Sequence, residues 1–590
     1  MVKQDLSHWT ISTGKSGLLL FAQAFEELIA PHSHDSYKVS ALNFHYICHE
    51  VLNVIELIED DVLDKGNFIP LWSEMLTLFQ GDPIAQQILG NDFDALFYKK
   101  NNKGEFDKQP IKIDKSKDVE SYLPTLKKGT QFIVKELGRN NQYYKRLLQE
   151  IKICIQNSSD DPIKLEPIFV VARILASELI NRGFSQAYIY DCVQQAFFKN
   201  SINVDTIDHI DKFFECFSSL KHKYCVYLPL NSIKQKKAFE EYGAFEMAEN
   251  VYEMFDSSIP YILKYSCEAC DPYAAREHAL ALANFCLSVN QFLKHNKYDY
   301  HPKYAEVIDT ESGIATFIRK PESALAQGYT DCGTLAVNDL LDTCVGLREG
   351  AFQVLQLHSM ALVSNDSHNQ LINLWTAIEV AIPVARKDGL SRINQISNVL
   401  TAALGRNYFS SLITQLTLDI KAVNENVSNK IQQIEYEGAI EEKLLAILFL
   451  PQFVALYDEI FHILVEDAPL VAYKLHRYKA NWSSAKNIKK AYLSHNERLA
   501  QQIMRIYRTR NMLVHDGSAM PYTDYVLQNL HYYVDTFIRF LNSYYKRGYR
   551  SIQTLVDAVQ FQEYRYLQLL CSDSAIDGNG IKTYILRKEC

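Results

Sequence analysis

The chain has 590 residues, of which 47% are hydrophobic and 22% charged, and its formal net charge is −9. One hydrophobic core rarely serves so long a chain, so we expect two to four domains. An acidic protein cannot coat nucleic acid over its whole surface, so any contact with RNA must be local. The twelve cysteines are scattered, and there is neither a signal-peptide core nor an apolar run as long as a membrane span. These features predict a cytoplasmic protein with no membrane segment.

The first 220 residues are predicted to form a helical region. Apolar periodicity indicates a helix over 166–181, and Gly183 occupies the position of a helix C-cap. Ser185 then begins another helix, which gives a helix–turn–helix corner. Such a corner is more typical of a tight helical hairpin than of a DNA-binding motif. The Lys-rich stretch 98–120 is predicted to be a surface loop.

Residues 221–340 have the pattern of a small α/β domain. Runs of β-branched and aromatic residues predict strands at 224–228, 260–269, 305–308 and 314–318. Asp271 and Pro272 are the residues expected at a helix N-cap and first turn. Cys267 and Cys270 form a lone C-x-x-C, followed by further His and Cys residues, so zinc is conceivable. We favour two thiols that close a strand, because no second pair has a suitable spacing.

Residues 345–570 are predicted to form a helical bundle, and residues 571–590 a C-terminal tail. The helices are expected at 348–362, 369–382, 392–404, 411–423, 440–466, 495–514, 523–545 and 552–570. The fold class is therefore mainly α and multi-domain, with an N-terminal helical region, a small central α/β segment and a C-terminal helical bundle.

The helix expected at 495–514 has a charged residue on its apolar stripe. Ser494 and Glu497 have the spacing of a capping box, and Gly517 lies just beyond the other end. By helical spacing, position 510 belongs to the core-facing stripe, but it is Arg510. A charge at such a position needs a partner or a function.

Arg510 and His515 are five residues apart, which is about 140° around an ideal helix, so they do not share a face. Asn511 and His515 are four apart and do share one, so Asn511 is placed to orient the imidazole. The helix C-terminus favours a protonated imidazole. A site built from Arg510 and His515 is more easily completed by a second copy, which predicts a homodimer.

A second helix has a similar anomaly. In the helix at 369–382, Glu379 falls on the apolar stripe. A buried carboxylate would need a cation, and Arg510 is the obvious candidate.

Basic residues are concentrated in one segment. Residues 469–550 contain fourteen Lys/Arg and four Asp/Glu, so this segment carries +10 and the rest of the chain −19. Such polarity indicates contact with a polyanion, although a solvated basic face has the same composition. Our candidates for binding substrate are Arg505, Arg508, Lys546 and Arg547.

The string Arg510-Asn511-Met512-Leu513-Val514-His515 at a helix end resembles the R-x4-6-H signature of the HEPN superfamily. The surrounding YRTRNMLVHDG, the upstream LWTAIE helix and the long helix after Thr523 also resemble HEPN proteins related to the ApeA group. The resemblance covers residues 345–570 and implies metal-independent RNA cleavage without a cofactor. It implies that His515 acts as general base or acid, Arg510 binds the phosphate, Asn511 orients and Glu379 holds Arg510.

HEPN enzymes of this kind serve as toxins or in anti-phage defence, often as dimers. The resemblance therefore implies that the N-terminal two thirds sense a trigger or restrain the nuclease, with a phage-derived or antitoxin partner. Two alternatives remain. One is a non-catalytic HEPN module that binds RNA, nucleotide or protein, and the other is a helical scaffold in which the motif is structural.

Overall fold

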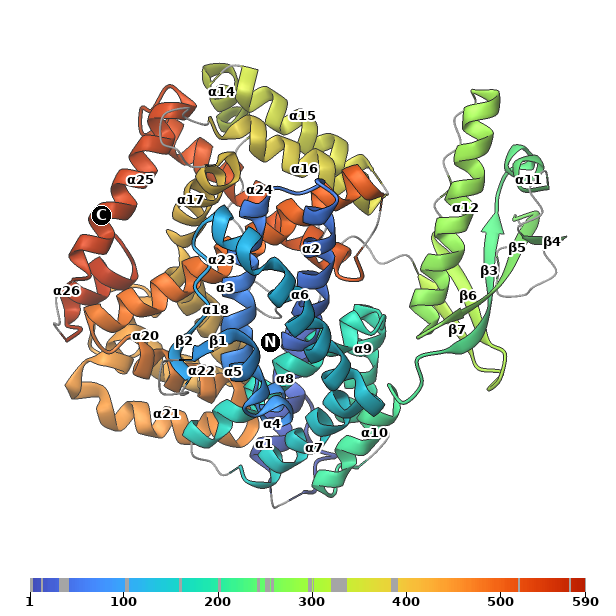
Figure 1. Ribbon diagram of the computed structural model, residues 1–590. Coiled ribbons are helices and arrows are strands. Elements are labelled where there is room, and N and C mark those ends of the chain that lie inside the picture. Colours follow the sequence, from blue (N-terminus) through green and yellow to red (C-terminus); the bar gives the residue numbers. More distant parts are fainter. Residues whose placement is uncertain are drawn as a thin grey trace.

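The computed structural model describes residues 4–588, except 12–13, 31–41, 101–105, 159–161, 200–202, 241–244, 250–254, 256–258, 296–299, 301, 320–336, 348, 365, 384–390, 518–519 and 572–574. The described chain is mainly α-helical, with a five-stranded antiparallel sheet in its middle third (Figure 1). This fold class agrees with the prediction from the sequence.

The N-terminal region is helical, as predicted. Its helices are α1 (Lys15–Ile29), α2 (Phe44–Glu59), α3 (Phe68–Gln80), α4 (Pro83–Leu89), α5 (Asp92–Phe97), α6 (Ser116–Gly138), α7 (Gln142–Gln156), α8 (Pro162–Asn181), α9 (Gln186–Val193) and α10 (Ile210–Glu215). The corner between α8 and α9 is also confirmed. Gly183 has a φ of 98°, which glycine tolerates best, and the Ser185 side chain accepts a hydrogen bond from the Tyr188 N–H.

The predicted surface loop at 98–120 is wrong. Strands β1 (Tyr98–Lys100) and β2 (Phe106–Pro110) pair antiparallel, and helix α6 already begins at Ser116. The Ile111 side chain just after β2 is buried, which ties the hairpin to the helices. A short hairpin rich in polar residues lacks the apolar periodicity that would predict it.

The central segment forms a sheet in the order β4-β5-β3-β6-β7. Its strands are β3 (His222–Leu230), β4 (Glu246–Glu249), β5 (Tyr261–Ala269), β6 (Tyr304–Asp309) and β7 (Ala315–Arg319). Helices α11 (Ile233–Glu240) and α12 (Pro272–Lys294) share its core. The four predicted strands are confirmed, and Asp271 caps α12 by accepting from the Ala274 N–H. This β-unit stands beside the helical body in Figure 1.

The C-terminal helices are α14 (Val337–Leu347), α15 (Glu349–Val363), α16 (Ser367–Ala381), α17 (Arg392–Gly405), α18 (Tyr408–Val423), α19 (Glu425–Gln432), α20 (Ile440–Phe449), α21 (Val454–Asp467), α22 (Pro469–Asn481), α23 (Ala485–Asp516), α24 (Thr523–Lys546), α25 (Ile552–Leu569) and the short α26 (Gly578–Gly580). The helix predicted at 440–466 is broken between α20 and α21, because Pro451 has no N–H and restricts the residue before it.

Among the described residues no single helix is long and apolar enough to cross a membrane. The bent pair α20–α21 passes that test by length and composition only, with an angle of 92° between its halves.

Helix α23 begins ten residues earlier than predicted. Its N-cap is Ser484, whose side chain accepts from the Asn487 N–H. The serine at 494 lies inside the helix. The buried Ile488 and Tyr492 extend the apolar stripe backwards, so packing carries the helix through the apparent capping box.

Two large cores hold the helical body together. One combines the N-terminal helices with residues from 344–559, and the other combines residues from 409–585. The helical regions expected at 1–220 and 345–570 therefore share a core, because α1 packs on both α8 and α22. The segment 571–590 is not a free tail, since Ile576, Ile581 and Ile585 are buried in the second core.

Candidate functional site

The candidate site lies at the C-terminal end of α23. Gly517 closes this helix in the left-handed conformation, with a φ of 64°, and its N–H donates to the Leu513 carbonyl. The helix is continuous through Asp516, so its last turn does not unwind. Arg510 and His515 therefore occupy different faces of the helix, as the spacing predicts.

Arg505 and Arg508 form a buried charge cluster with two N-terminal helices. Arg508 Nε donates to Glu50 of α2 at 2.9 Å, and Arg505 Nη2 donates to Glu74 of α3 at 2.7 Å. Arg505 also contacts Glu50, at 3.3 Å. Both guanidinium groups are essentially inaccessible to solvent. The substrate-binding roles predicted for Arg505 and Arg508 are therefore wrong for this conformation, in which both hold α23 to the N-terminal helices.

Arg510 has different surroundings from its two neighbours. It is half-buried, and its Nη1 donates to the Asn511 side-chain oxygen at 3.1 Å. No carboxylate of the described residues lies within ion-pair distance of it. The predicted ion pair with Glu379 is not formed. Glu379 is only partly buried, so water can solvate its carboxylate, and its backbone carbonyl accepts from Arg392.

Helix α16 nevertheless packs against α23, through the rings of Trp375 and Tyr507 at 5.6 Å. The two helices are thus neighbours, but Glu379 is not the partner of Arg510.

Asn511 is buried and binds Arg510, and no hydrogen bond joins it to the exposed His515. The predicted steering of His515 by Asn511 is therefore not seen. The bond has a different effect. It draws the Arg510 guanidinium towards the face of Asn511, which is only about 40° from His515 around an ideal helix.

Lys546 and Arg547, at the end of α24, are both exposed. Lys546 pairs with Asp339 of α14, and Arg547 lies over the Tyr544 ring at 5.4 Å. Both remain accessible to a polyanion, unlike Arg505 and Arg508.

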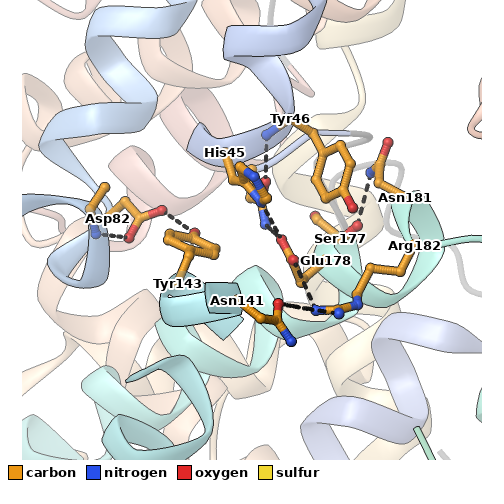
Figure 2. Close-up of polar contacts among 11 residues, drawn as sticks. His45, Tyr46, Asp82, Asn141, Tyr143, Ser177, Glu178, Asn181 and Arg182 are labelled. Carbon is orange, nitrogen blue, oxygen red and sulfur yellow. Dashed lines mark hydrogen bonds and ion pairs between the residues drawn. The ribbon is translucent and has the colours of Figure 1, made fainter. Parts of the chain in front are cut away.

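A second polar cluster was not predicted from the sequence (Figure 2). The buried Glu178 of α8 accepts from Asn43 at 2.8 Å and contacts His45 at 3.3 Å, both at the start of α2. Its other oxygen lies 3.6 Å from Arg182, which donates to Asn141 and stacks on a tyrosine ring.

Burial opposes the charge of Glu178, but its contacts with His45, Asn43 and Arg182 hold the pKa of this carboxyl below its ordinary value. Both carboxylate oxygens are already engaged, so we interpret the cluster as a structural link between α2, α7 and α8. The residues come from three separate segments, and no sequence pattern connects them.

The two thiols of the C-x-x-C contact different backbone carbonyls. Cys267 Sγ lies 3.9 Å from the Ala275 carbonyl, and Cys270 Sγ lies 3.2 Å from that of Leu220. Among the described residues, no group of three or more His, Cys, Asp or Glu side chains has the arrangement of a metal site.

The chain matches no model of a protein family, no curated protein and no solved structure. Its resemblance to the HEPN superfamily therefore depends on the residues at the end of α23 and on their geometry.

Proposed function

We propose that this protein is a metal-independent endoribonuclease of the HEPN type, in which Arg510 and His515 act on RNA. One observation carries the proposal. Arg505, Arg508 and Arg510 lie within two turns of α23, and carboxylates neutralise the first two, whereas Arg510 has no such partner among the described residues. A cation without a carboxylate, five residues before an exposed imidazole at a helix end, suits an anionic substrate.

The chemistry needs no metal, because the ribose 2′-OH is already placed next to the phosphodiester. His515 takes the proton of the 2′-OH, and the resulting oxygen attacks the phosphorus. The bond to the 5′-oxygen breaks, this oxygen takes a proton from solvent, and a 2′,3′-cyclic phosphate remains. The planar guanidinium of Arg510 binds the phosphate oxygens and stabilises the charge that develops on them. Lys546 and Arg547 lie at the far end of the 24-residue α24, about 35 Å along that helix from its start, so they would contact RNA away from the cleaved bond.

We propose further that the working site is a composite of two copies. Arg510 and His515 lie on different faces of α23. The exposed Val514 lies between these two faces around the helix axis. A second α23 packed on this surface would place its His515 against the first copy's Arg510. The N-terminal region, clamped to α23, would sense a trigger or partner. Such an enzyme would act in the cytoplasm, as a toxin or in defence against phage.

The test is RNA cleavage in EDTA, with detection of the 2′,3′-cyclic phosphate. Arg510→Ala and His515→Gln should each reduce the cleavage rate at least a hundredfold while melting like the parent, and the control His278→Gln, at an exposed position on α12, should not. Parent-like cutting by His515→Gln would refute the proposal. RNA that binds but stays intact would favour the non-catalytic alternative.

Mixing the two inactive variants tests the composite site. In a mixed dimer, the copy with His515→Gln supplies Arg510 and the copy with Arg510→Ala supplies His515, so one of the two sites is intact. Cleavage should therefore recover on mixing. If it does not, each copy contains its own complete site.

A further inference from the structure

A cavity of about 610 Å³ lies where the N-terminal helices meet the C-terminal ones. Its walls come from α1, α3, α8, α18, α22 and α23. Neither Arg510 nor His515 lines it, so the cavity is separate from the sequence motif. Its volume is within the range of small-molecule sites, which is about 300–1,000 Å³.

The cavity has a surplus of positive charge. Six Lys or Arg residues line it, against three Asp or Glu residues. Lys474 is neutralised by Glu27 at 2.6 Å and Asp419 at 3.3 Å, and Arg505 belongs to the buried charge cluster.

Arg477 and Lys490 are less fully neutralised, because no ion pair of the described residues includes either of them. Burial opposes the charge of Arg477, but Tyr473 and the charge of Glu166 still act on it and raise the pKa of its guanidinium. Arg477 instead donates a long hydrogen bond, of 3.4 Å, to the Tyr473 hydroxyl. Arg173 and Arg498 add two further cations to the lining. An anion in the cavity would be met by several guanidinium groups at once.

Aromatic rings form another part of the lining. Tyr408 and Tyr478 are half-buried, and Tyr478 stacks on Trp482 with centroids 4.4 Å apart. Tyr408 stacks on His495 at 3.6 Å. Each tyrosine ring is therefore packed against a neighbouring ring. Aromatic rings beside cations suit a ligand with both a flat ring and a negative charge.

We propose that this cavity binds a nucleotide, with its phosphates on Arg477 and the neighbouring arginines and its base against Tyr408 and Tyr478. The site is separate from the RNA-cleaving motif and does not depend on it. It also lies along α23, which contributes Lys490 and Arg498 to the cavity and carries His515 in its last turn. A bound nucleotide would therefore touch the N-terminal helices and the motif helix together.

Titration calorimetry of the full-length protein with ATP, GTP, CTP and UTP tests the proposal, with adenosine and inorganic triphosphate as reference probes. At least one nucleoside triphosphate should bind, and adenosine should bind at least tenfold more weakly. Arg477→Gln should weaken nucleotide binding at least tenfold, and Tyr408→Leu should weaken it while leaving triphosphate binding unchanged. The control is Lys479→Gln, a cation on the same helix that contacts the Tyr457 ring and does not line the cavity.

Three results would overturn the proposal. The first is that no nucleotide binds at millimolar concentration. The second is that Arg477→Gln and Lys479→Gln bind equally well while both melt like the parent. The third is that inorganic triphosphate binds as tightly as every nucleotide, which would assign the cavity to simple polyanions.

Discussion

Replacing Glu50 by Gln should destabilise the protein by about 3 kcal/mol, because two buried arginines would then have only Glu74 as a counter-charge. Glu50 has both oxygens in the cluster. One accepts from Arg508 at 2.9 Å and the other contacts Arg505 at 3.3 Å. All three side chains are almost wholly buried, so water cannot replace the lost carboxylate.

The size of this effect follows from burial. Desolvation opposes the charge of Glu50, but Arg508 and Arg505 outweigh it and hold the pKa of this carboxyl below its ordinary value. A carboxyl with a lowered pKa contributes stability that is present above its unfolded-state pKa and is lost as pH falls through the folded value. The gap between parent and Glu50→Gln should therefore be full at pH 7 and narrow below about pH 4.5.

The matched control is Glu59→Gln, on the same helix. Glu59 pairs with Lys127 at 2.5 Å, but its side chain is 42% exposed, so solvent screening limits its contribution to less than about 1 kcal/mol. Urea unfolding at pH 7, followed by tryptophan fluorescence, compares the two variants. If Glu50→Gln cost no more than Glu59→Gln, the buried cluster would not be what holds α23 to α2 and α3.

Three further changes test the local structure. Ser484→Ala removes the N-cap of α23 and should lower the free energy of unfolding in urea by about 1 kcal/mol. Ser494→Ala, at an exposed position inside the helix, should lower it by less than about 0.5 kcal/mol. The reverse order would place the helix start at 494. Gly405→Ala should destabilise by about 1–3 kcal/mol, because its new methyl would lie 2.7 Å from the hydroxyl of the buried Tyr492, whereas Gly138→Ala, with nothing within 4 Å, should be neutral or slightly stabilising. Burial and the nearby Arg498 lower the pKa of His495 to about 3. As pH falls below about 6.5 the unfolded state therefore takes up a proton before the folded state does, and the free energy of unfolding declines towards pH 3. His495→Gln should flatten this decline, and an equal decline in parent and variant would contradict the lowered pKa of His495.

Local signals in the sequence predicted the elements that depend on local interactions. Asp271 and Pro272 set the start of α12, and both act within one helical turn. Gly517 sets the end of α23, because glycine adopts the left-handed conformation without steric cost. The strands at 224–228 and 260–269 were found because their β-branched and aromatic residues pack in a sheet core.

What the sequence could not supply was the identity of distant partners. Arg510 and Glu379 were paired because both fell on apolar stripes, but the carboxylates that approach the α23 arginines are Glu50 and Glu74, more than 400 residues away. Periodicity locates a residue on a face of its own helix and contains no information on which helix covers that face. The same limit explains the Ser494 error, since a capping box is a local pattern and the buried Ile488 and Tyr492 override it.

Helix α23 connects the functional proposals physically. Its 32 residues span about 48 Å and carry in turn the cavity cations Lys490 and Arg498, the clamp formed by Arg505 and Arg508, and the motif residues Arg510 and His515. The carboxylates of that clamp belong to α2 and α3, so a bundle cut free at residue 345 would lose both the counter-charges of these two arginines and the helices that cover them. The motif helix is therefore not energetically independent of the N-terminal helices. In the proposed function, a ligand or partner that shifts α2 or α3 would act on the motif through this clamp, because Glu50 and Glu74 hold α23 directly.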